Sequence, residues 1–149
     1  MKLSTRTRYG LRALAELAVL SDNGGPVGMR QIARHQAISK KYLENIFTDL
    51  RTAGFIRTVR GASGGYALAV PPEQLRVDKV VSALEGGLEL VCCVDHSGDS
   101  CSRAGKCAAH DLWKELSDTI RKTLSRYTLA DLAEVRRREM KKETSRKEC

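Results

Sequence analysis

The sequence of 149 residues predicts a mainly α-helical fold that carries one small β-hairpin. Two observations support this prediction. Apolar residues recur at steps of three and four along much of the chain, which is the spacing of one face of a helix. Two short runs rich in β-forming residues, 55–59 and 66–70, flank a glycine-rich turn, which is the pattern of a hairpin. The length suffices for one domain with a proper core and an appended arm.

Three helices are expected before the hairpin. The first covers residues 5–21, where the apolar side chains form one face, and it ends in the turn residues 22–26. A shorter helix fits residues 29–36. Ser39 is a good N-cap for the third helix, which Gly54 ends. Two short helices joined by a tight turn, the second capped and polar on its outer face, form the helix-turn-helix pattern.

The hairpin directly follows this pattern, which is the position of a wing, so residues 1–87 are predicted to be a winged helix-turn-helix domain. Residues 1–70 hold 11 Lys and Arg against 4 Asp and Glu, within a chain total of 26 against 18. Such an excess of positive charge is expected for contacts with the phosphates of double-stranded DNA, although a solvated basic surface is the simpler alternative. Charge alone suggests phosphate contacts for Lys2, Arg6 and Arg8.

The candidate DNA-contacting residues lie in the first turns of the third helix and at the tip of the hairpin. They are Ser39, Lys41, Tyr42, Glu44, Arg60 and Gly61. The start of a recognition helix reaches base edges and phosphates, and an arginine at a hairpin tip can enter a narrow minor groove. Ser39 has the alternative role of a plain N-cap, and Tyr42 that of a core residue. Glu44 would repel phosphates unless it accepts from a cytosine amino group, so it could tune the choice of sequence.

A long helix is expected in the second half of the chain, after a short helix over residues 77–85. It begins at His110 and carries an apolar stripe of Leu112, Trp113, Leu116, Ile120 and Leu124. An exposed stripe of this kind usually meets a partner helix, so it is expected to form the seam of a homodimer; packing against the first helix of the same chain is the alternative. Thr128 and Asp131 cap a short last helix, which completes a dimerisation unit over residues 110–135. The charged tail, 136–149, is expected to be disordered.

A cysteine-rich loop, 88–110, separates these two parts. Four of the five cysteines, Cys92, Cys93, Cys101 and Cys107, precede His110 in a stretch rich in Gly, Ser and Asp. Thiolates with one imidazole are ligands of zinc or of an iron–sulfur cluster. Structural zinc sites usually contain a Cys-x₂₋₄-Cys knuckle, whereas the separations from Cys93 onward are 8 and 6 residues. The spacing therefore favours a cluster over zinc, with a metal-free thiol switch as a further alternative. His96 competes with His110 as the imidazole ligand.

Four blocks of the sequence resemble a known family. They are Met1-Lys-Leu-Ser-Thr-Arg-Thr-Arg-Tyr-Gly10, Ile38-Ser-Lys-Lys-Tyr-Leu-Glu44, Val59-Arg-Gly-Ala-Ser-Gly-Gly-Tyr66 and Lys106-Cys-Ala-Ala-His-Asp-Leu-Trp113. Over roughly residues 1–135 the chain resembles the Rrf-type winged-helix regulators. The last block is most similar to the IscR-like members, in which three Cys and one His hold a [2Fe–2S] cluster. The resemblance thus implies that Cys93, Cys101, Cys107 and His110 are the cluster ligands, with a [4Fe–4S] cluster or zinc as alternative occupants.

One part of the loop departs from the IscR-like pattern. In those members the first ligand lies closer to the second than Cys93 lies to Cys101 here. The run Leu90-Val-Cys-Cys93 is similar to the NsrR-like members, which favours Cys93 as the first ligand and leaves Cys92 as the alternative.

The resemblance implies a homodimeric, DNA-binding transcription regulator that senses an iron–sulfur cluster and controls genes of cluster biogenesis. A nitric-oxide or redox sensor of the same family is an alternative, as is a zinc or iron–sulfur redox protein with an incidental basic domain. No nucleophile–base pair stands out, so an enzyme is not expected. No apolar run approaches the roughly 18 to 20 residues of a membrane span, and no signal peptide is evident, so a cytoplasmic location is expected.

Overall fold

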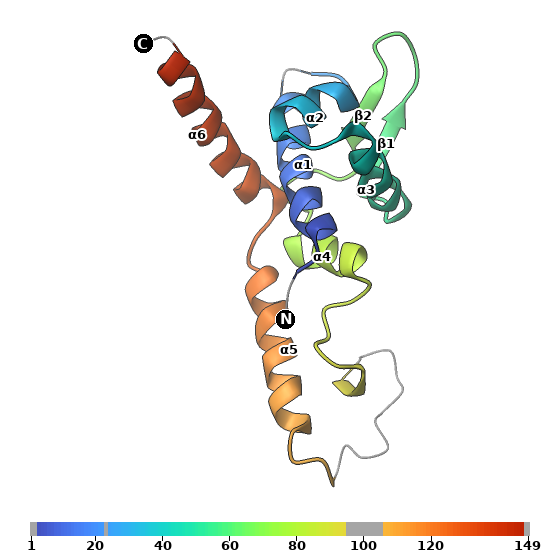
Figure 1. Ribbon diagram of the computed structural model, residues 1–149, viewed down its shortest axis with the longest axis vertical. Helices are drawn as coiled ribbons and strands as arrows, with labels where there is room; N and C mark the ends of the chain where they lie inside the picture. Colours follow the sequence, from blue (N-terminus) through green and yellow to red (C-terminus); the bar gives the residue numbers. More distant parts are fainter. Residues whose placement is uncertain (1–2, 23, 95–105, 148–149) are drawn as a thin grey trace.

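The computed structural model describes residues 3–22, 24–94 and 106–147. Its elements follow the order α1 (Thr5–Ser21), α2 (Met29–Gln36), α3 (Lys40–Thr52), β1 (Ile56–Val59), β2 (Gly65–Leu68), α4 (Val77–Glu85), η1 (Cys92–Val94), α5 (His110–Leu124) and α6 (Leu129–Lys147). Figure 1 shows α1 to α4 and the hairpin gathered in one head, with α5 extending below it and α6 rising beside α1. Across the described ranges, no helix combines the length and apolar character needed to cross a membrane.

The predicted helix starts are confirmed by their caps. Ser4 Oγ accepts from the backbone N–H of Thr7 at 3.1 Å, and Ser39 Oγ accepts from that of Tyr42 at 3.3 Å. Each serine therefore satisfies one of the N–H groups that the first turn of a helix leaves without an intrahelical partner. Ala37 joins α2 to α3 in the left-handed region, with φ of 52°.

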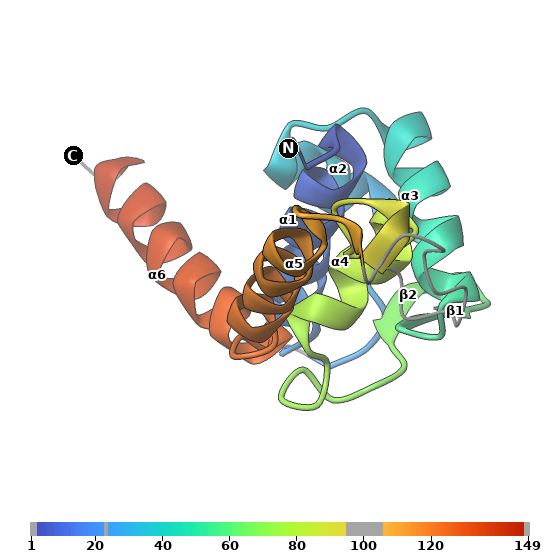
Figure 2. The same ribbon diagram turned by 90° about the horizontal axis from the view of Figure 1, so that it is seen from below.

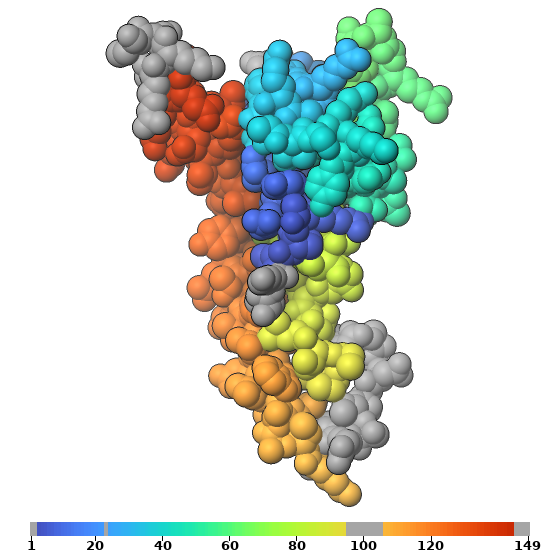
Figure 3. Space-filling model, viewed as in Figure 1, coloured from blue at the N-terminus to red at the C-terminus, as the bar shows by residue number. Residues whose placement is uncertain are grey.

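The hairpin is antiparallel, with Ile56 opposite Leu68 and Val59 opposite Gly65. It is therefore slightly shorter than the two runs of β-forming residues predicted from the sequence. Its base is fastened to the head because Val27 and Tyr66 exchange backbone hydrogen bonds of 2.8 and 2.9 Å. Its tip projects from the head in the space-filling view of Figure 3.

One apolar core holds the head together, and α1 lies at its centre. Fully buried side chains come from α1, α2, α3 and β1, and include Leu14, Leu17, Ile32, Leu43, Phe47, Leu50 and Ile56. Gly10 allows α1 to approach α4 closely: a methyl group at this position would lie 2.5 Å from Leu84 Cδ1. Leu129 and Ala133, at the start of α6, belong to the same core. The C-terminal helix is thus packed on the head, against α1.

The prediction of a short last helix and a disordered tail is wrong, since α6 continues to Lys147. Its first turn has the predicted capping pair, in which the backbone N–H of Thr128 donates to Asp131 Oδ2 at 2.7 Å. Ion pairs one turn apart then support the helix: Glu134 with Arg138 at 3.1 Å and Glu139 with Lys142 at 3.2 Å. The many charges that suggested disorder are therefore arranged to stabilise a helix.

Candidate nucleic-acid interface and metal centre

The outer face of α3 presents the predicted DNA-contacting residues. Lys41 and Glu44 are exposed, and Ser39 is occupied as the N-cap of the helix. Glu44 is not an isolated carboxylate, because Lys40 Nζ lies 3.2 Å from its Oε1, one turn earlier. The positive charge of Lys40 reduces the repulsion that is expected between the Glu44 carboxylate and DNA phosphates.

Tyr42 is half-buried, and its ring meets that of Tyr9 edge-on with the centroids 6.0 Å apart. The core role considered for Tyr42 is therefore present in the structure. Arg6, proposed from charge alone as a phosphate contact, is instead paired with Asp49 of α3. The pair joins α1 to α3, and Figure 1 shows the two helices beside each other.

Arg60 and Gly61 occupy the exposed tip of the hairpin. Gly61 has φ of 122°, a conformation that side chains other than hydrogen disfavour, so glycine suits the bend there. The described contacts place no ion-pair partner on Arg60. Its guanidinium is free to reach a groove beside the one that α3 would enter.

The cysteine loop is described only at its two ends. Cys92 and Cys93 lie in η1, which packs against α5, and Figure 3 shows this segment alongside that helix. Cys107 is exposed, and its carbonyl oxygen accepts from the backbone N–H of His110 at 3.2 Å. Cys101 and His96 lie outside the described residues. Within the described residues, no three His, Cys, Asp or Glu side chains are grouped closely enough to hold a metal ion.

Two contacts join the segment between α4 and η1 to α5. The backbone N–H of Leu90 donates to Ser117 Oγ at 3.3 Å, and Arg121 pairs with Glu89. Burial alone would raise the pKa of Glu89, but backbone N–H groups and Arg121 outweigh it and the pKa is lowered. These contacts hold the segment 89–90, which leads into η1, against the middle of α5.

The apolar stripe of α5 has two parts. Leu112 and Leu116 are 56% and 41% exposed. Trp113, Leu116, Ile120 and Leu124 line a groove with Leu3, Val81 and the chain at 87–91. These four side chains of the stripe therefore border an open groove beside α4 and the chain before η1, whereas Leu112 lies outside the groove and is exposed. Figure 2, seen from below, shows α5 over the head and α6 on the side opposite the hairpin.

One buried polar cluster, around Glu16, was not predicted from the sequence. This side chain is fully buried on α1 and contacts His35 and Gln36 of α2 and Arg136 of α6. Burial alone would raise the pKa of Glu16, but the hydrogen bonds from Arg136, His35 and Gln36 outweigh it and lower the pKa. A single glutamate within the apolar run Ala13 to Ala18 was the signal that could have revealed it.

Comparisons with known proteins agree with this arrangement. Residues 3–135 match the Rrf2 family model, described as an iron-dependent transcriptional regulator. IscR of Aliivibrio salmonicida is 36% identical over 132 residues, which cover 89% of this chain and 77% of that protein. The structure of CymR, the global cysteine regulator of B. subtilis, superimposes with a TM-score of 0.72 at 33% identity and covers 91% of this chain and 98% of its own.

A second solved structure, IscR of T. potens, superimposes with a TM-score of 0.71 at 33% identity and covers 90% of this chain and 87% of its own. These likenesses confirm the winged-helix fold and DNA-binding regulation, and they exclude an enzyme as the general class. The chain belongs to the Rrf2 family of transcriptional regulators.

Proposed function

We propose that this chain is a homodimeric transcription regulator that senses an iron–sulfur cluster held by Cys93, Cys101, Cys107 and His110, and that it controls genes of cluster biogenesis. One observation carries the proposal. The short helix η1, which bears Cys92 and Cys93, packs against the helix whose first residue is His110. The described ends of the cysteine loop are therefore held at the same element, α5. The similarity to IscR supports the proposed sensing of a cluster.

The donor set fits a cluster with one imidazole ligand. Thiolates are the usual ligands of iron–sulfur clusters, and histidine replaces some of them in the centres of higher potential. His110 Nδ1 lies 3.3 Å from Asp111 Oδ1, so a proton on Nδ1 leaves Nε2 as the ligating nitrogen. Cys107 is exposed. Of the two candidates for the first ligand, Cys92 is exposed and Cys93 is partly buried, so both are at least partly accessible. We propose a [2Fe–2S] cluster as the occupant.

The residues themselves suggest how the site would reach the DNA-binding head. His110 is a ligand candidate and also the first residue of α5, so its position and that of the helix are coupled. The helix leads through the turn at 125–128 into α6, whose residues Leu129 and Ala133 lie in the core of the head. A bound cluster supplies a state that depends on iron supply and redox conditions. When the cluster fixes the position of His110, it also fixes the start of α5 and, through α5, the position of α6 on the head.

A homodimer is supported by the outward part of the α5 stripe. Leu112 and Leu116 are large apolar side chains exposed on one helix, which monomeric proteins seldom leave in a continuous row. Pairing two copies through this row would bring two α3 helices to two successive half-sites of an operator.

The test is to purify the protein without oxygen and to measure its visible absorption, iron and acid-labile sulfide. A cluster gives red-brown protein that absorbs between about 400 and 600 nm. Cys101→Ala and Cys107→Ala should both abolish the colour. Cys93→Ala and Cys92→Ala form a matched pair, and only the first should do so. Colourless protein with stoichiometric zinc would overturn the proposal.

A further inference from the structure

Glu16 joins three helices, α1, α2 and α6, through one buried carboxylate. His35 Nδ1 lies 2.6 Å from Oε1, and Gln36 Nε2 donates to Oε2 at 2.5 Å. Arg136 Nε donates to the same Oε2 at 2.6 Å, although Arg136 stands 120 residues later in the chain. A fully buried carboxylate is stable only when its oxygens are paired in this way, so α1, α2 and α6 are held by a contact that none can lose cheaply.

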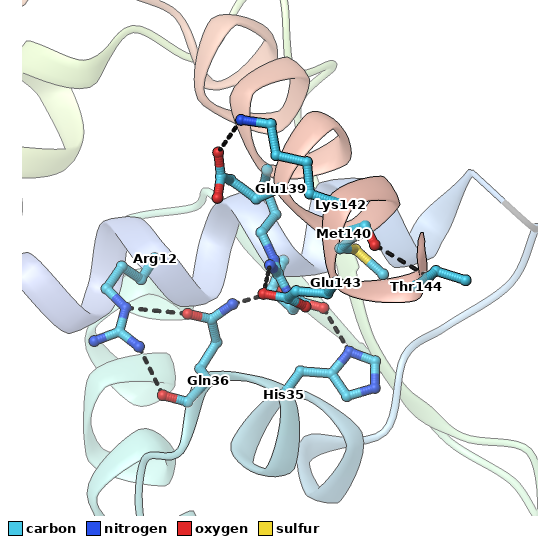
Figure 4. A network of polar contacts seen from close by, with 10 residues as sticks. Arg12, His35, Gln36, Glu139, Met140, Lys142, Glu143 and Thr144 are labelled. Carbon is cyan, nitrogen blue, oxygen red and sulfur yellow. Dashed lines mark hydrogen bonds and ion pairs between the residues drawn. The ribbon is translucent and has the colours of Figure 1, made fainter. Parts of the chain in front are cut away.

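The cluster continues toward the recognition helix through Gln36. Arg12 Nε donates to Gln36 Oε1 at 3.1 Å, and Arg12 Nη2 donates to the carbonyl oxygen of Gln36 at 2.7 Å. The guanidinium of Arg12 also lies over the ring of Tyr9, 5.3 Å from its centroid, and Tyr9 meets Tyr42 of α3. Figure 4 shows Arg12, Gln36 and His35 together beside the charged residues of α6.

The backbone held by these contacts is the turn that sets the direction of α3. Gln36 is the last residue of α2, and Ala37 follows it in the left-handed region, which costs an alanine energy. The backbone N–H of Ile38 donates to the carbonyl oxygen of Ala33 at 3.1 Å and closes the turn. A strained turn of this kind persists when its surroundings determine it, and the side chains of Glu16 and Arg12 are part of those surroundings.

We propose that Glu16 is a positioning residue for DNA binding: with Arg136 it ties the C-terminal helix α6 to the turn before α3, so that α6 determines how the recognition helix is presented. Glu16 is fully buried and the side chain of Arg136 is only 16% exposed, so their effect on affinity acts through the position of α3. The inference rests on the proposed role of α3 in reading DNA. In this proposal α6 positions the recognition helix, in addition to contributing Leu129 and Ala133 to the core.

The experiment uses the full-length protein and a duplex that the wild-type protein selects from a randomised library, with a random duplex as the comparison. Arg136→Met removes the charged partner of Glu16. It should lower affinity for the selected duplex by at least about fivefold, the lower end of coupling between distant sites, and affect the random duplex less. Arg136→Lys keeps the charge and should restore part of the loss.

Arg137→Met is the matched control. Arg137 is the next residue of α6, and its partner Asp22, the exposed C-cap residue of α1, lies 2.8 Å away. This variant loses the same charge but not the contact with Glu16, so it should bind the selected duplex as the wild type does. Equal affinity of wild type and Arg136→Met, or equal losses in Arg136→Met and Arg137→Met, would overturn the proposal.

A second variant covers the case in which Arg136→Met fails to fold. Glu16→Gln combined with Arg136→Met removes both charges, and neutral replacement of a buried pair often preserves folding. This double variant should fold but bind the selected duplex more weakly; wild-type affinity would refute the positioning role.

Amide hydrogen exchange tests the link between α6 and the turn before α3 independently of the proposed role of α3 in binding DNA. In the folded double variant, the amides of Ala37 and Ile38 should exchange faster than in the wild type, whether or not DNA is bound. If Lys41→Ala leaves DNA binding intact, the role of α3 is wrong, but faster exchange at the turn would still report the link to α6. Unchanged exchange at Ala37 and Ile38 would remove that link.

Discussion

Lys40 and Glu44 form an ion pair on the outer face of α3, with Nζ and Oε1 3.2 Å apart. Both side chains are about half exposed, so the pair contributes only about 0.3–0.5 kcal/mol to stability. Its consequence concerns DNA. The carboxylate that could accept from a cytosine amino group is held beside a cation, which lowers the cost of bringing it near phosphates.

Glu44→Ala should therefore relax base choice without unfolding the protein. Loss of one specific base contact costs about 1–3 kcal/mol of discrimination, and Lys40 gains freedom to bind phosphates. The measurement is selection from randomised duplexes, for wild type and variant, with and without the cluster. We expect the two cluster states of the wild type to prefer different sequences and the variant to lose part of that difference. Identical selected sequences in all four cases would remove Glu44 from recognition.

Arg60→Ala should weaken binding to the selected duplex by about 1–3 kcal/mol, because a guanidinium at the wing tip contributes one good groove contact. The thermal midpoint should be unchanged, since the side chain is exposed. Arg57→Ala, on β1, is a matched control because Arg57 is also exposed but stands away from the tip. Equal affinities of wild type and Arg60→Ala would exclude the wing from the interface.

Leu116→Lys should convert the proposed homodimer into a monomer. The change places an ammonium group in the proposed seam, where its desolvation costs several kcal/mol. Sedimentation should show the monomer, and DNA affinity should fall sharply because two half-sites no longer act together.

Glu115→Lys introduces the same side chain at the neighbouring exposed position and should leave the dimer intact. A dimer that survives Leu116→Lys would assign the stripe to packing within one chain.

Stability should fall in acid because of Glu16. Its pKa in the folded protein is lowered from the ordinary value of 4.5, so the unfolded chain binds the proton more readily. The ion pair contributes fully above pH 4.5, and this contribution is lost as the pH falls below that value through the folded pKa. Urea unfolding from neutral to acid pH should show a steeper loss for wild type than for Glu16→Gln, which is also less stable at neutral pH. Parallel curves would contradict this assignment.

Local patterns were enough to predict much of the head. The first helix, the second helix and α4 begin and end where the apolar period and the turn residues placed them. Ser39 caps α3, and Thr128 caps α6 together with Asp131, because capping depends on residues only three positions apart. The exposed positions of Lys41, Glu44 and Arg60 also follow from the polar face of a helix and the tip of a hairpin. Their contacts with DNA, and the ligand set of the cysteine loop, stay predictions.

The sequence by itself determined the fold class, the caps and the residues available for DNA and metal chemistry, because these depend on neighbours along the chain. Only the tertiary structure decided that the C-terminal segment forms a long helix packed on α1. Its charges predicted disorder, but Arg136 pairs with Glu16 on the first helix, and Arg137 pairs with Asp22, the residue that follows that helix. A partner more than 100 residues away leaves no periodic trace in either segment, and only the packing of α6 on α1 brings the opposite charges together.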